Sequence, residues 1–325
     1  MSKIKVAVFM GGISTEREIS LQTGNQILAA LNKDKYIAYA VDTAILAHAK
    51  DVGVNSCDLN TLLLNPIYGI PDVVFLALHG KGGEDGSIQG LLELAGIPYT
   101  GSGVLASSLA MNKAMTKKLL RMENIPTPED IVCSRGSDLS TISAQVERQI
   151  GFPVIVKPNS QGSTVGCSRV NSGDLLLNAI QEAWVYDQTA LLEKYIAGVE
   201  ITVGLLGDEK PQVLPIIEIQ SAKGFYDYEA KYTQGGSSHI IPARISSKAA
   251  NIARDYAIRT HQIIGCSGVS RVDMIVCEEQ PIVLEINTIP GMTPMSLLPD
   301  AAKSAGIAFP DLLDRILTIT LSKSL

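Results

Sequence analysis

The sequence has no long hydrophobic run, and none of its apolar stretches approaches the ~20 residues needed to cross a membrane. It also has no run of basic residues, and its net charge of -6 argues against nucleic acid as the main partner. The five cysteines are scattered, odd in number and free of any C-x-x-C pair, so we expect reduced thiols, no zinc site and a cytoplasmic location. There is no internal repeat and no low-complexity segment.

The N-terminal segment imitates a secretion signal without completing one. The apolar run within Met1–Met10 is short and leads into Glu16, Arg17 and Glu18, so we interpret it as the first strand of the fold. With 325 residues, of which 46% are hydrophobic and 18% charged, the chain can bury substantial cores. Its length predicts two or three domains.

The N-terminal part alternates short apolar segments with helical patterns, which predicts an open parallel sheet of the doubly wound kind. A helix is expected from Glu16 to Asn32, because Thr15 and Glu18 have the spacing of a capping box. Strands are expected at Ile4–Met10, Tyr36–Val41, Val73–Leu78 and Pro98–Tyr99.

Such sheets bind ligands beyond the carboxyl ends of their strands, which here means Gly11–Glu18 and His79–Gly86. Gly11-Gly12 does not complete a G-x-G-x-x-G pattern, so a dinucleotide site is disfavoured.

A second region follows the prolines Pro126 and Pro128, which mark a plausible boundary after a helix at Ala106–Glu123. A third region opens near Glu200 and contains the stretch Gln220–Ile240, which has no clear period; long irregular stretches of this kind are often functional lids. The further elements that we expect are strands at Phe152–Lys157, Ala190–Lys194, Ile201–Leu206 and Gln212–Ile219, and helices at Leu175–Trp184, Met295–Ala305 and Pro310–Leu321.

The most informative pattern is a predicted hairpin between residues 269–277 and 282–287, joined by Glu278-Glu279-Gln280. If it closes symmetrically, Cys277 faces Pro281, Asp273 faces Glu285 and Arg271 faces Asn287. Residues two apart share one face of a strand, so these four polar side chains near the open end lie on the same side.

Two carboxylates directly opposite each other repel, so Asp273 and Glu285 require a cation between their oxygens. Carboxylate and amide oxygens suit Mg2+ or Mn2+, with Asn287 as the third protein ligand. The alternative is a solvated hairpin face on which Arg271 neutralises Asp273.

The loop Asn159–Gly166 is rich in glycine and hydroxyl residues, and its backbone N–H groups can approach an anion. It is not a Walker A loop, because no Gly-Lys-Ser/Thr follows. Lys157 ends the preceding strand and can direct its charge to the same place, and Lys113 and Lys231 are further candidates. A glycine-rich loop or a strand-end lysine alone is common in proteins of many functions. A phosphate loop, strand-end lysines and a carboxylate hairpin in one chain are much stronger evidence together.

Several motifs together resemble the D-alanine:D-alanine ligase family of ATP-grasp enzymes. The resemblance spans nearly the whole chain, in the order of that family. The motifs are Gly11-Gly12-Ile13-Ser14-Thr15-Glu16-Arg17-Glu18-Ile19-Ser20, Leu78-His79-Gly80-Lys81-Gly82-Gly83-Glu84-Asp85-Gly86, Tyr99-Thr100-Gly101-Ser102-Gly103, Val156-Lys157-Pro158, Gly162-Ser163-Thr164-Val165-Gly166, Glu193-Lys194-Tyr195, Tyr226-Asp227-Tyr228-Glu229-Ala230-Lys231-Tyr232 and Glu285-Ile286-Asn287-Thr288-Ile289-Pro290-Gly291-Met292-Thr293.

The resemblance implies an α/β fold in which an N-terminal open parallel sheet domain (1–108) precedes a two-domain ATP-grasp fold of the α+β kind (109–198 and 199–325, with a lid at about 220–240). It implies ATP between the last two domains, two Mg2+ or Mn2+ ions, D-alanine as substrate and a homodimer. It further implies a reaction in which the first D-alanine carboxylate attacks the γ-phosphate and the amine of the second displaces phosphate from the acyl phosphate.

The resemblance also implies roles for individual residues. Glu16 would bind the ammonium of the first D-alanine, near His79, with Ser163 and Tyr232 as its hydrogen-bonded partners. Arg271 and the backbone N–H of Gly291 would stabilise the oxyanion, while Ser296 and Leu297 would receive the second substrate. Nucleotide contacts would come from Lys113, Lys157, Ser163, Glu193, Lys194, Tyr195, Ile196, Glu200, Phe225, Lys231 and Asn287, and metal contacts from Asp273, Glu285 and Asn287.

Two positions bear on alternatives to this function. Tyr232 favours the dipeptide, because ligases that make the D-lactate ester usually lack a tyrosine there. Gln161 departs from the family, which more often has glutamate beside the phosphate loop. A D-serine or D-lactate ligase, or a non-catalytic nucleotide-binding protein with this fold, remain the alternatives, and the sequence assigns no role to Arg244.

Overall fold

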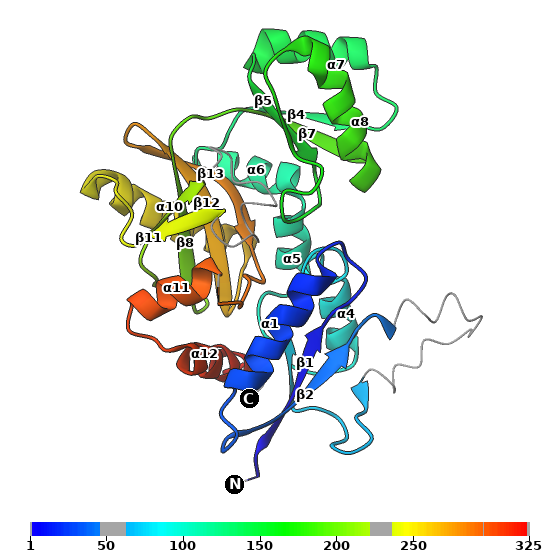
Figure 1. The fold of residues 1–325 in the computed structure, drawn as a ribbon, viewed down its shortest axis with the longest axis vertical. Coiled ribbons are helices and arrows are strands. Elements are labelled where there is room, and N and C mark those ends of the chain that lie inside the picture. The colour runs from blue at the N-terminus through cyan, green and yellow to red at the C-terminus, as the bar shows by residue number, and fades with distance from the viewer. Residues whose placement is uncertain (1, 46–62, 222–235, 295, 324–325) are drawn as a thin grey trace, which may run out of the picture.

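The computed structural model describes residues 2–45, 63–221, 236–294 and 296–323 (Figure 1). The expectations for Phe225, Lys231 and Tyr232, and for most of the lid segment, lie outside these residues. Among the described helices, none is both long and apolar enough to cross a membrane. The cysteines of the described part, Cys133, Cys167, Cys266 and Cys277, form no disulfide with one another.

The N-terminal part contains the predicted parallel sheet. Strands β1 (Ile4–Met10), β2 (Tyr36–Asp42) and β3 (Val73–Leu76) are ordered β2-β1-β3, with helices α1 (Arg17–Ala30) and α4 (Ser87–Leu94) packed on it. The expected strand at Pro98–Tyr99 is reduced to one bridge between Val74 and Tyr99. The sequence located β1 and β3 because each is an almost unbroken buried apolar run, whereas β2 is only partly buried.

The predicted capping box at the start of α1 is wrong. Glu16 is the N-cap residue and makes no side-chain capping bond. Its backbone N–H instead donates to Ser14 Oγ at 3.1 Å. The Glu16 side chain is therefore directed elsewhere, toward the site described below.

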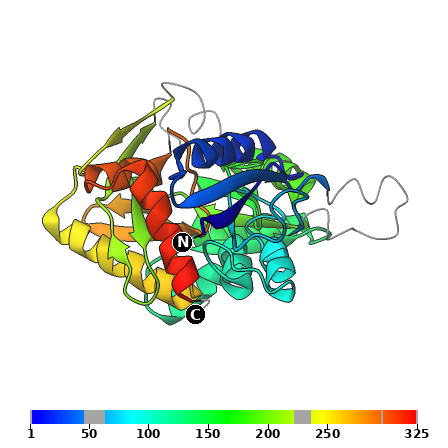
Figure 2. The same ribbon diagram turned by 90° about the horizontal axis from the view of Figure 1, so that it is seen from below.

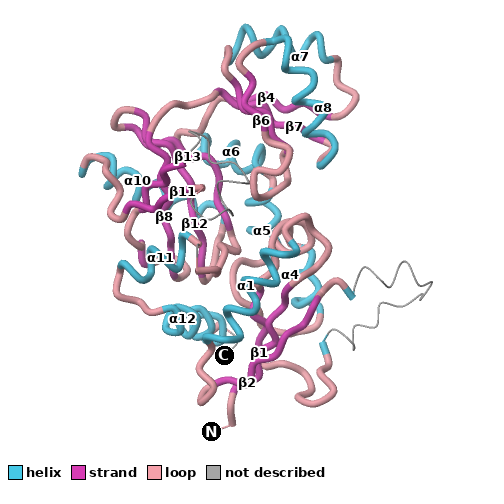
Figure 3. Tube along the Cα trace, in the orientation of Figure 1, coloured by secondary structure: helices cyan, strands magenta, loops and turns pink. Residues whose placement is uncertain are grey.

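The helix expected at Ala106–Glu123 is two helices, α5 (Val104–Met111) and α6 (Lys113–Met122). Asn112 separates them because its backbone is extended and its side chain accepts a hydrogen bond from Met115 N, capping α6. Both helices lie where the three parts of the molecule meet (Figure 3). Their apolar residues share a core cluster with the C-terminal sheet.

The central part is an antiparallel sheet of order β4-β7-β5-β6, formed by β4 (Asp130–Ser134), β5 (Val154–Pro158), β6 (Ser168–Val170) and β7 (Thr189–Lys194). Helices α7 (Leu139–Gln145) and α8 (Leu176–Tyr186) contribute to its separate apolar core, together with a π-helical turn at Val146–Ile150. The apolar core of this part is separate from the cores of the other two sheets.

The C-terminal sheet has the order β11-β10-β8-β12-β13, with β9 (Gln212–Val213) paired to β8. Its strands are β8 (Val199–Leu206), β10 (Ile217–Ser221), β11 (Ser237–Ile240), β12 (Val269–Cys277) and β13 (Gln280–Asn287). Helix α10 (Ser247–Ile264), which was not predicted, contacts β8, β12 and β13. The sequence features that could have predicted this helix are Ser246 as its N-cap, Gly265 after its last turn and buried alanines four residues apart.

The chain returns to its beginning through α11 (Leu297–Ser304) and α12 (Phe309–Ser322). Helix α12 lies beside α1, as Figure 2 shows, and shares the apolar cluster of the N-terminal sheet. Asp314 on α12 accepts a hydrogen bond from Tyr36 Oη at 2.7 Å and forms an ion pair with Lys35 at 3.0 Å. The first and last parts are thus joined through one core.

Candidate active site

The hairpin β12–β13 has the predicted register at the end that carries the polar residues. Arg271 pairs with Asn287 and Asp273 with Glu285. The register then shifts between Asp273 and Met274, and Cys277 pairs with Gln280 rather than Pro281. The symmetric closure was therefore wrong at the turn, because a β-bulge changes the register and the turn is only two residues long.

Arg271 and Asp273 form a bidentate contact along β12. Arg271 Nε donates to Asp273 Oδ1 at 2.9 Å, and one terminal guanidinium nitrogen donates to Oδ2 at 2.8 Å. Thr202 on β8 donates to the same Oδ1 at 2.5 Å. The alternative in which Arg271 neutralises Asp273 is correct about this contact, but both groups are largely buried rather than solvated.

Two cavities meet at this hairpin. The first, of about 310 Å³, lies between the N-terminal part and the C-terminal sheet; among its lining residues are Glu16, His79, Arg271, Asn287, Gly291, Ser296 and Leu297. The second, of about 180 Å³, lies between β5–β7 and the hairpin and includes Lys157, Glu193, Lys194, Tyr195, Ile196 and Glu200. Lys113, Gly162, Ser163 and Glu285 line both cavities.

The glycine-rich loop reaches Glu16 at this shared wall. Ser163 Oγ donates a hydrogen bond to Glu16 Oε1 across the junction. A Cβ at Gly162 or at Gly80 would lie within 2.7 Å of Glu16 Oε2, so a larger residue at either position would displace the Glu16 carboxylate. Ser163 and Thr164 adopt positive φ angles of 50° and 61°, a costly conformation for these residue types that is common where a loop is shaped around a site.

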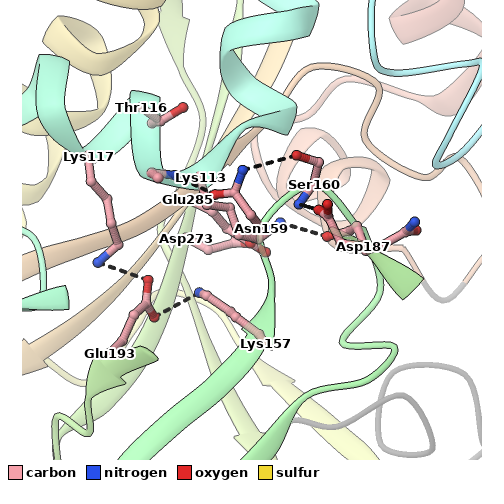
Figure 4. Close-up of polar contacts among 12 residues, drawn as sticks. Lys113, Thr116, Lys117, Lys157, Asn159, Ser160, Asp187, Glu193, Asp273 and Glu285 are labelled. Carbon is pink, nitrogen blue, oxygen red and sulfur yellow. Dashed lines mark hydrogen bonds and ion pairs between the residues drawn. The ribbon is translucent and has the colours of Figure 1, made fainter. Parts of the chain in front are cut away.

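The glycine-rich loop is fixed at its start by Asn159 and Ser160 (Figure 4). Asn159 Oδ1 accepts from Ala114 N at 2.9 Å, and Ser160 N donates to Asp187 Oδ2 at 2.7 Å. Lys113 Nζ donates to the carbonyl of Gln161 at 2.6 Å and lies 3.5 Å from Glu285 Oε2. These contacts hold the loop against α6 and place a cation at the junction of the cavities.

Glu193 is buried between two lysines, of which Lys157 lines the second cavity. Its Oε2 lies 2.8 Å from Lys157 Nζ and its Oε1 lies 2.8 Å from Lys117 Nζ. Burial alone would lower the pKa of Lys157, but the Glu193 and Glu285 carboxylates outweigh it and raise that pKa. The Glu193 carboxylate is therefore occupied by these two lysines.

Two residues of the site were not found by sequence reasoning, although their segments were singled out. Glu84 in the His79–Gly86 segment is buried in the first cavity and accepts from Gly80 N at 2.7 Å. Burial and the nearby Glu16 raise its pKa. Lys117 lies one turn beyond Lys113 on α6, a spacing that places both on one face of the helix.

One end of the first cavity is formed by the turn before α11. Ser296 Oγ accepts from Thr293 N at 3.0 Å, which fixes the hydroxyl beside Gly291. Arg244, for which no role was expected, contacts the Glu218 carboxylate of β10 through its guanidinium and, at 3.0 Å, through its backbone N–H. Gln161 donates through Nε2 to the carbonyl of Tyr186 at 3.1 Å, a contact with the end of α8.

The hairpin carries the carboxylate and amide oxygens that a hard divalent cation prefers as ligands. Asp273 and Glu285 are opposed across the strands, and Asn287 adds an amide oxygen on the same face. Within the described residues, no group of three or more His, Cys, Asp or Glu side chains is arranged to hold a metal ion. Because both oxygens of Asp273 contact Arg271, Glu285 is the carboxylate that faces the cavities directly.

His79 makes stability depend on pH. Burial, and then the positive charge of Arg271, lower its pKa from 6.5 to about 4. The unfolded chain therefore binds the proton more readily between these values, and the free energy of unfolding falls as pH drops through this window. We expect a loss of about 2 kcal/mol between pH 7 and pH 5. His79→Asn should reduce this loss in urea titrations at the two pH values, and an unchanged pH dependence would contradict the assignment.

Comparisons with known proteins identify relatives over almost the entire length. A family model described as the D-ala D-ala ligase C-terminus matches residues 119–318, and one described as the N-terminus matches residues 54–102. The D-alanine--D-alanine ligase of Pelotomaculum thermopropionicum is 45% identical over 325 residues, covering 98% of this chain and 97% of the relative.

Two solved structures show the same architecture. The D-alanine--D-alanine ligase of Bacillus anthracis complexed with ATP has a TM-score of 0.81 at 34% identity and covers 99% of this chain and 98% of that one. The VanG D-Ala:D-Ser ligase of Enterococcus faecalis has a TM-score of 0.83 at 32% identity and covers 98% of this chain and 100% of that one. Both confirm the expected fold class.

Proposed function

Because this chain belongs to the D-alanine–D-alanine ligase family, we propose that it joins two D-alanine molecules with consumption of ATP, releasing ADP and phosphate and supplying peptidoglycan synthesis. The observation that carries the proposal is the shared wall of two cavities, where Lys113, Ser163 and Glu285 face both spaces. A phosphoryl group bound in one cavity and a carboxylate bound in the other would meet there.

In the first step, a carboxylate oxygen of the first D-alanine attacks the γ-phosphorus of ATP, and ADP leaves. Lys113 and Lys157 lie where they can balance the negative charge of the transferring group. A magnesium or manganese ion held by Asp273, Glu285 and Asn287 would supply further charge neutralisation when bound. The second cavity, with Lys194, Tyr195, Ile196 and Glu200, would hold the nucleoside. Ser163, which lines both cavities, and Asn287, which lines the first, are proposed phosphate contacts.

In the second step, the amine of the second D-alanine attacks the acyl phosphate carbon, and phosphate leaves with the oxygen that it received. The tetrahedral intermediate carries an oxyanion, for which Arg271 and Gly291 N–H are the proposed donors. Ser296 and Leu297 would receive the acceptor at the same cavity. Phe225, Lys231 and Tyr232 are proposed to complete the site from outside the described residues.

Glu16 is the proposed partner of the first substrate's ammonium group. Glu16→Gln keeps the shape of the side chain and removes its charge, so KM for the first D-alanine should rise about 10- to 100-fold, because a charge-assisted hydrogen bond of about 1.5–3 kcal/mol is lost. Glu18→Gln is the matched control, because Glu18 is exposed on the same helix. Initial-rate measurements over a range of D-alanine concentrations test this; an unchanged KM would remove Glu16 from substrate binding.

The choice of second substrate needs a direct test, because the fold is equally close to a D-Ala:D-Ser ligase. Mass spectrometry of products formed from D-alanine with equal amounts of D-alanine, D-serine and D-lactate should show mainly the D-alanyl-D-alanine dipeptide. Predominant D-serine dipeptide or D-lactate ester would overturn the acceptor assignment while leaving the ligase chemistry in place. A protein that makes no product from any acceptor would instead support the non-catalytic alternative.

We also propose that the protein acts in the cytoplasm as a homodimer and divides into domains at about 108/109 and 198/199. Family membership and the separate core of the central part support these assignments. Light scattering of the purified protein should give twice the mass of one chain, and a monomer at micromolar concentration would contradict the dimer.

A further inference from the structure

Lys117 is the most deeply buried charged side chain beside the second cavity. It is 1% exposed and is not among the described residues that line either cavity. Its Nζ lies 2.8 Å from Glu193 Oε1 and donates to the carbonyl of Pro128 at 3.0 Å. A buried ammonium group needs such partners, because leaving water is costly. Nothing in the reaction as described above uses this residue.

Glu193 lies between Lys117 and the second cavity, which is the proposed nucleotide site. Figure 4 shows Lys117 and Lys157 approaching the Glu193 carboxylate from opposite sides, and each Nζ lies 2.8 Å from a different oxygen. Lys157 lines the second cavity, whereas Lys117 lies behind it. The three side chains therefore form a linear cation–anion–cation group with only one cation facing the cavity.

The net charge of these three side chains determines how strongly they attract an anionic ligand in the second cavity. Two ammonium groups and one carboxylate carry a net charge of +1. Without Lys117, the charges of Lys157 and Glu193 would cancel each other, and a polyphosphate would meet no net charge from these two side chains. Glu285 also lies close enough to raise the pKa of Lys157, which adds to the need for a second cation.

We propose that Lys117 is a positioning residue for nucleotide binding: it neutralises Glu193 from behind, so that Glu193 can hold Lys157 in place without cancelling its charge. This inference rests on the proposed function, since it assumes that the second cavity holds a nucleotide. The charge states agree with it. Burial lowers the pKa of Lys117 to about 8. Burial alone would raise the pKa of Glu193, but the positive charges of Lys157 and Lys117 outweigh it and lower that pKa.

The test compares three variants by equilibrium binding of ADP and by steady-state kinetics. Lys117→Met removes one positive charge and should weaken ADP binding about 10-fold or more, since a unit charge acting over several ångströms in a protein is worth at least that factor. KM for ATP should rise in parallel, whereas KM for D-alanine should change less than about twofold. Lys118→Met, exposed on the same helix, is the matched control and should behave as the wild type.

The double variant Lys117→Met/Glu193→Gln separates electrostatics from packing. It returns the net charge of the group to +1 but restores neither the Lys117 hydrogen bond to Pro128 nor its side chain. Recovery of ADP affinity to within about threefold of the wild type supports the proposal, and it does so even where Lys117→Met alone fails to fold. A folded double variant that binds ADP as weakly as Lys117→Met overturns the proposal, as does a single variant with wild-type affinity.

Two results distinguish failure of the proposed ligase function from failure of the role assigned to Lys117. If the wild-type protein binds no ADP and forms no dipeptide, the proposed function fails. If the wild type is active and Lys117→Met binds ADP as tightly, only the role of Lys117 fails.

Discussion

Arg271→Ala is expected to lower turnover about 100-fold or more while changing ADP affinity little. Arg271 faces the first cavity and is the proposed donor to the oxyanion of the second step, and loss of such a donor costs about 3 kcal/mol of transition-state stabilisation. Arg271 is not among the described residues that line the second cavity, which is the proposed nucleotide site. Nucleotide binding should therefore persist. Steady-state kinetics and calorimetric ADP binding measure the two quantities.

The contact between Arg271 and Asp273 makes a control necessary. Removing the guanidinium leaves the Asp273 carboxylate with Thr202 as its remaining described partner, so stability can also fall. Thermal unfolding should show that the variant is folded at the assay temperature. Arg254→Ala, on the exposed side of α10, is the matched substitution and should leave turnover unchanged. A folded Arg271→Ala enzyme with near-normal turnover would remove Arg271 from the chemistry.

Glu285→Gln is expected to lower turnover about 1,000-fold, because metal-assisted charge neutralisation is worth several kcal/mol in phosphoryl transfer. Glu285 faces both cavities, lies opposite Asp273 and is 3.5 Å from Lys113. The amide keeps the size of the side chain but loses the charge that a divalent cation requires. The same variant should also lose the magnesium dependence of ADP binding, which calorimetry with and without Mg2+ measures.

Glu279→Gln is the matched control for this variant. Glu279 lies at the other end of the same hairpin, where its carboxylate pairs with Lys248 at the surface. It should show wild-type turnover and wild-type magnesium dependence. Turnover of Glu285→Gln within a few-fold of the wild type would exclude Glu285 as the central metal ligand and would direct attention to Asp273 and Asn287.

The sequence predicted much of this architecture where local pattern determines structure. The strand Ile4–Met10 was located to the residue because it is short, apolar and bounded by Gly11. The pairs Asp273–Glu285 and Arg271–Asn287 were placed correctly because each strand keeps its alternation of faces near the open end of the hairpin. The bulge beside Met274 was not predictable, because nothing in that apolar run marks an extra residue.

What the sequence could not provide depends on contacts between distant segments. Glu193 was expected to contact adenine, yet its carboxylate is held by Lys117 and Lys157 from two other elements. The bond between Ser163 and Glu16 joins the N-terminal part to the central loop and was expected only through resemblance to a family. Such pairs are set by how separate cores pack, and periodicity within one segment carries no information about them.

In the proposed reaction, a carboxylate bound in one cavity attacks the γ-phosphate bound in the other at their shared wall. D-Alanine labelled with oxygen-18 in its carboxylate tests this directly, because the attacking oxygen must leave with the phosphate when the amine displaces it. Mass spectrometry of the inorganic phosphate should find one oxygen-18 atom for each dipeptide formed. Phosphate without label, with all of the oxygen-18 retained in the dipeptide and residual D-alanine, would contradict the account.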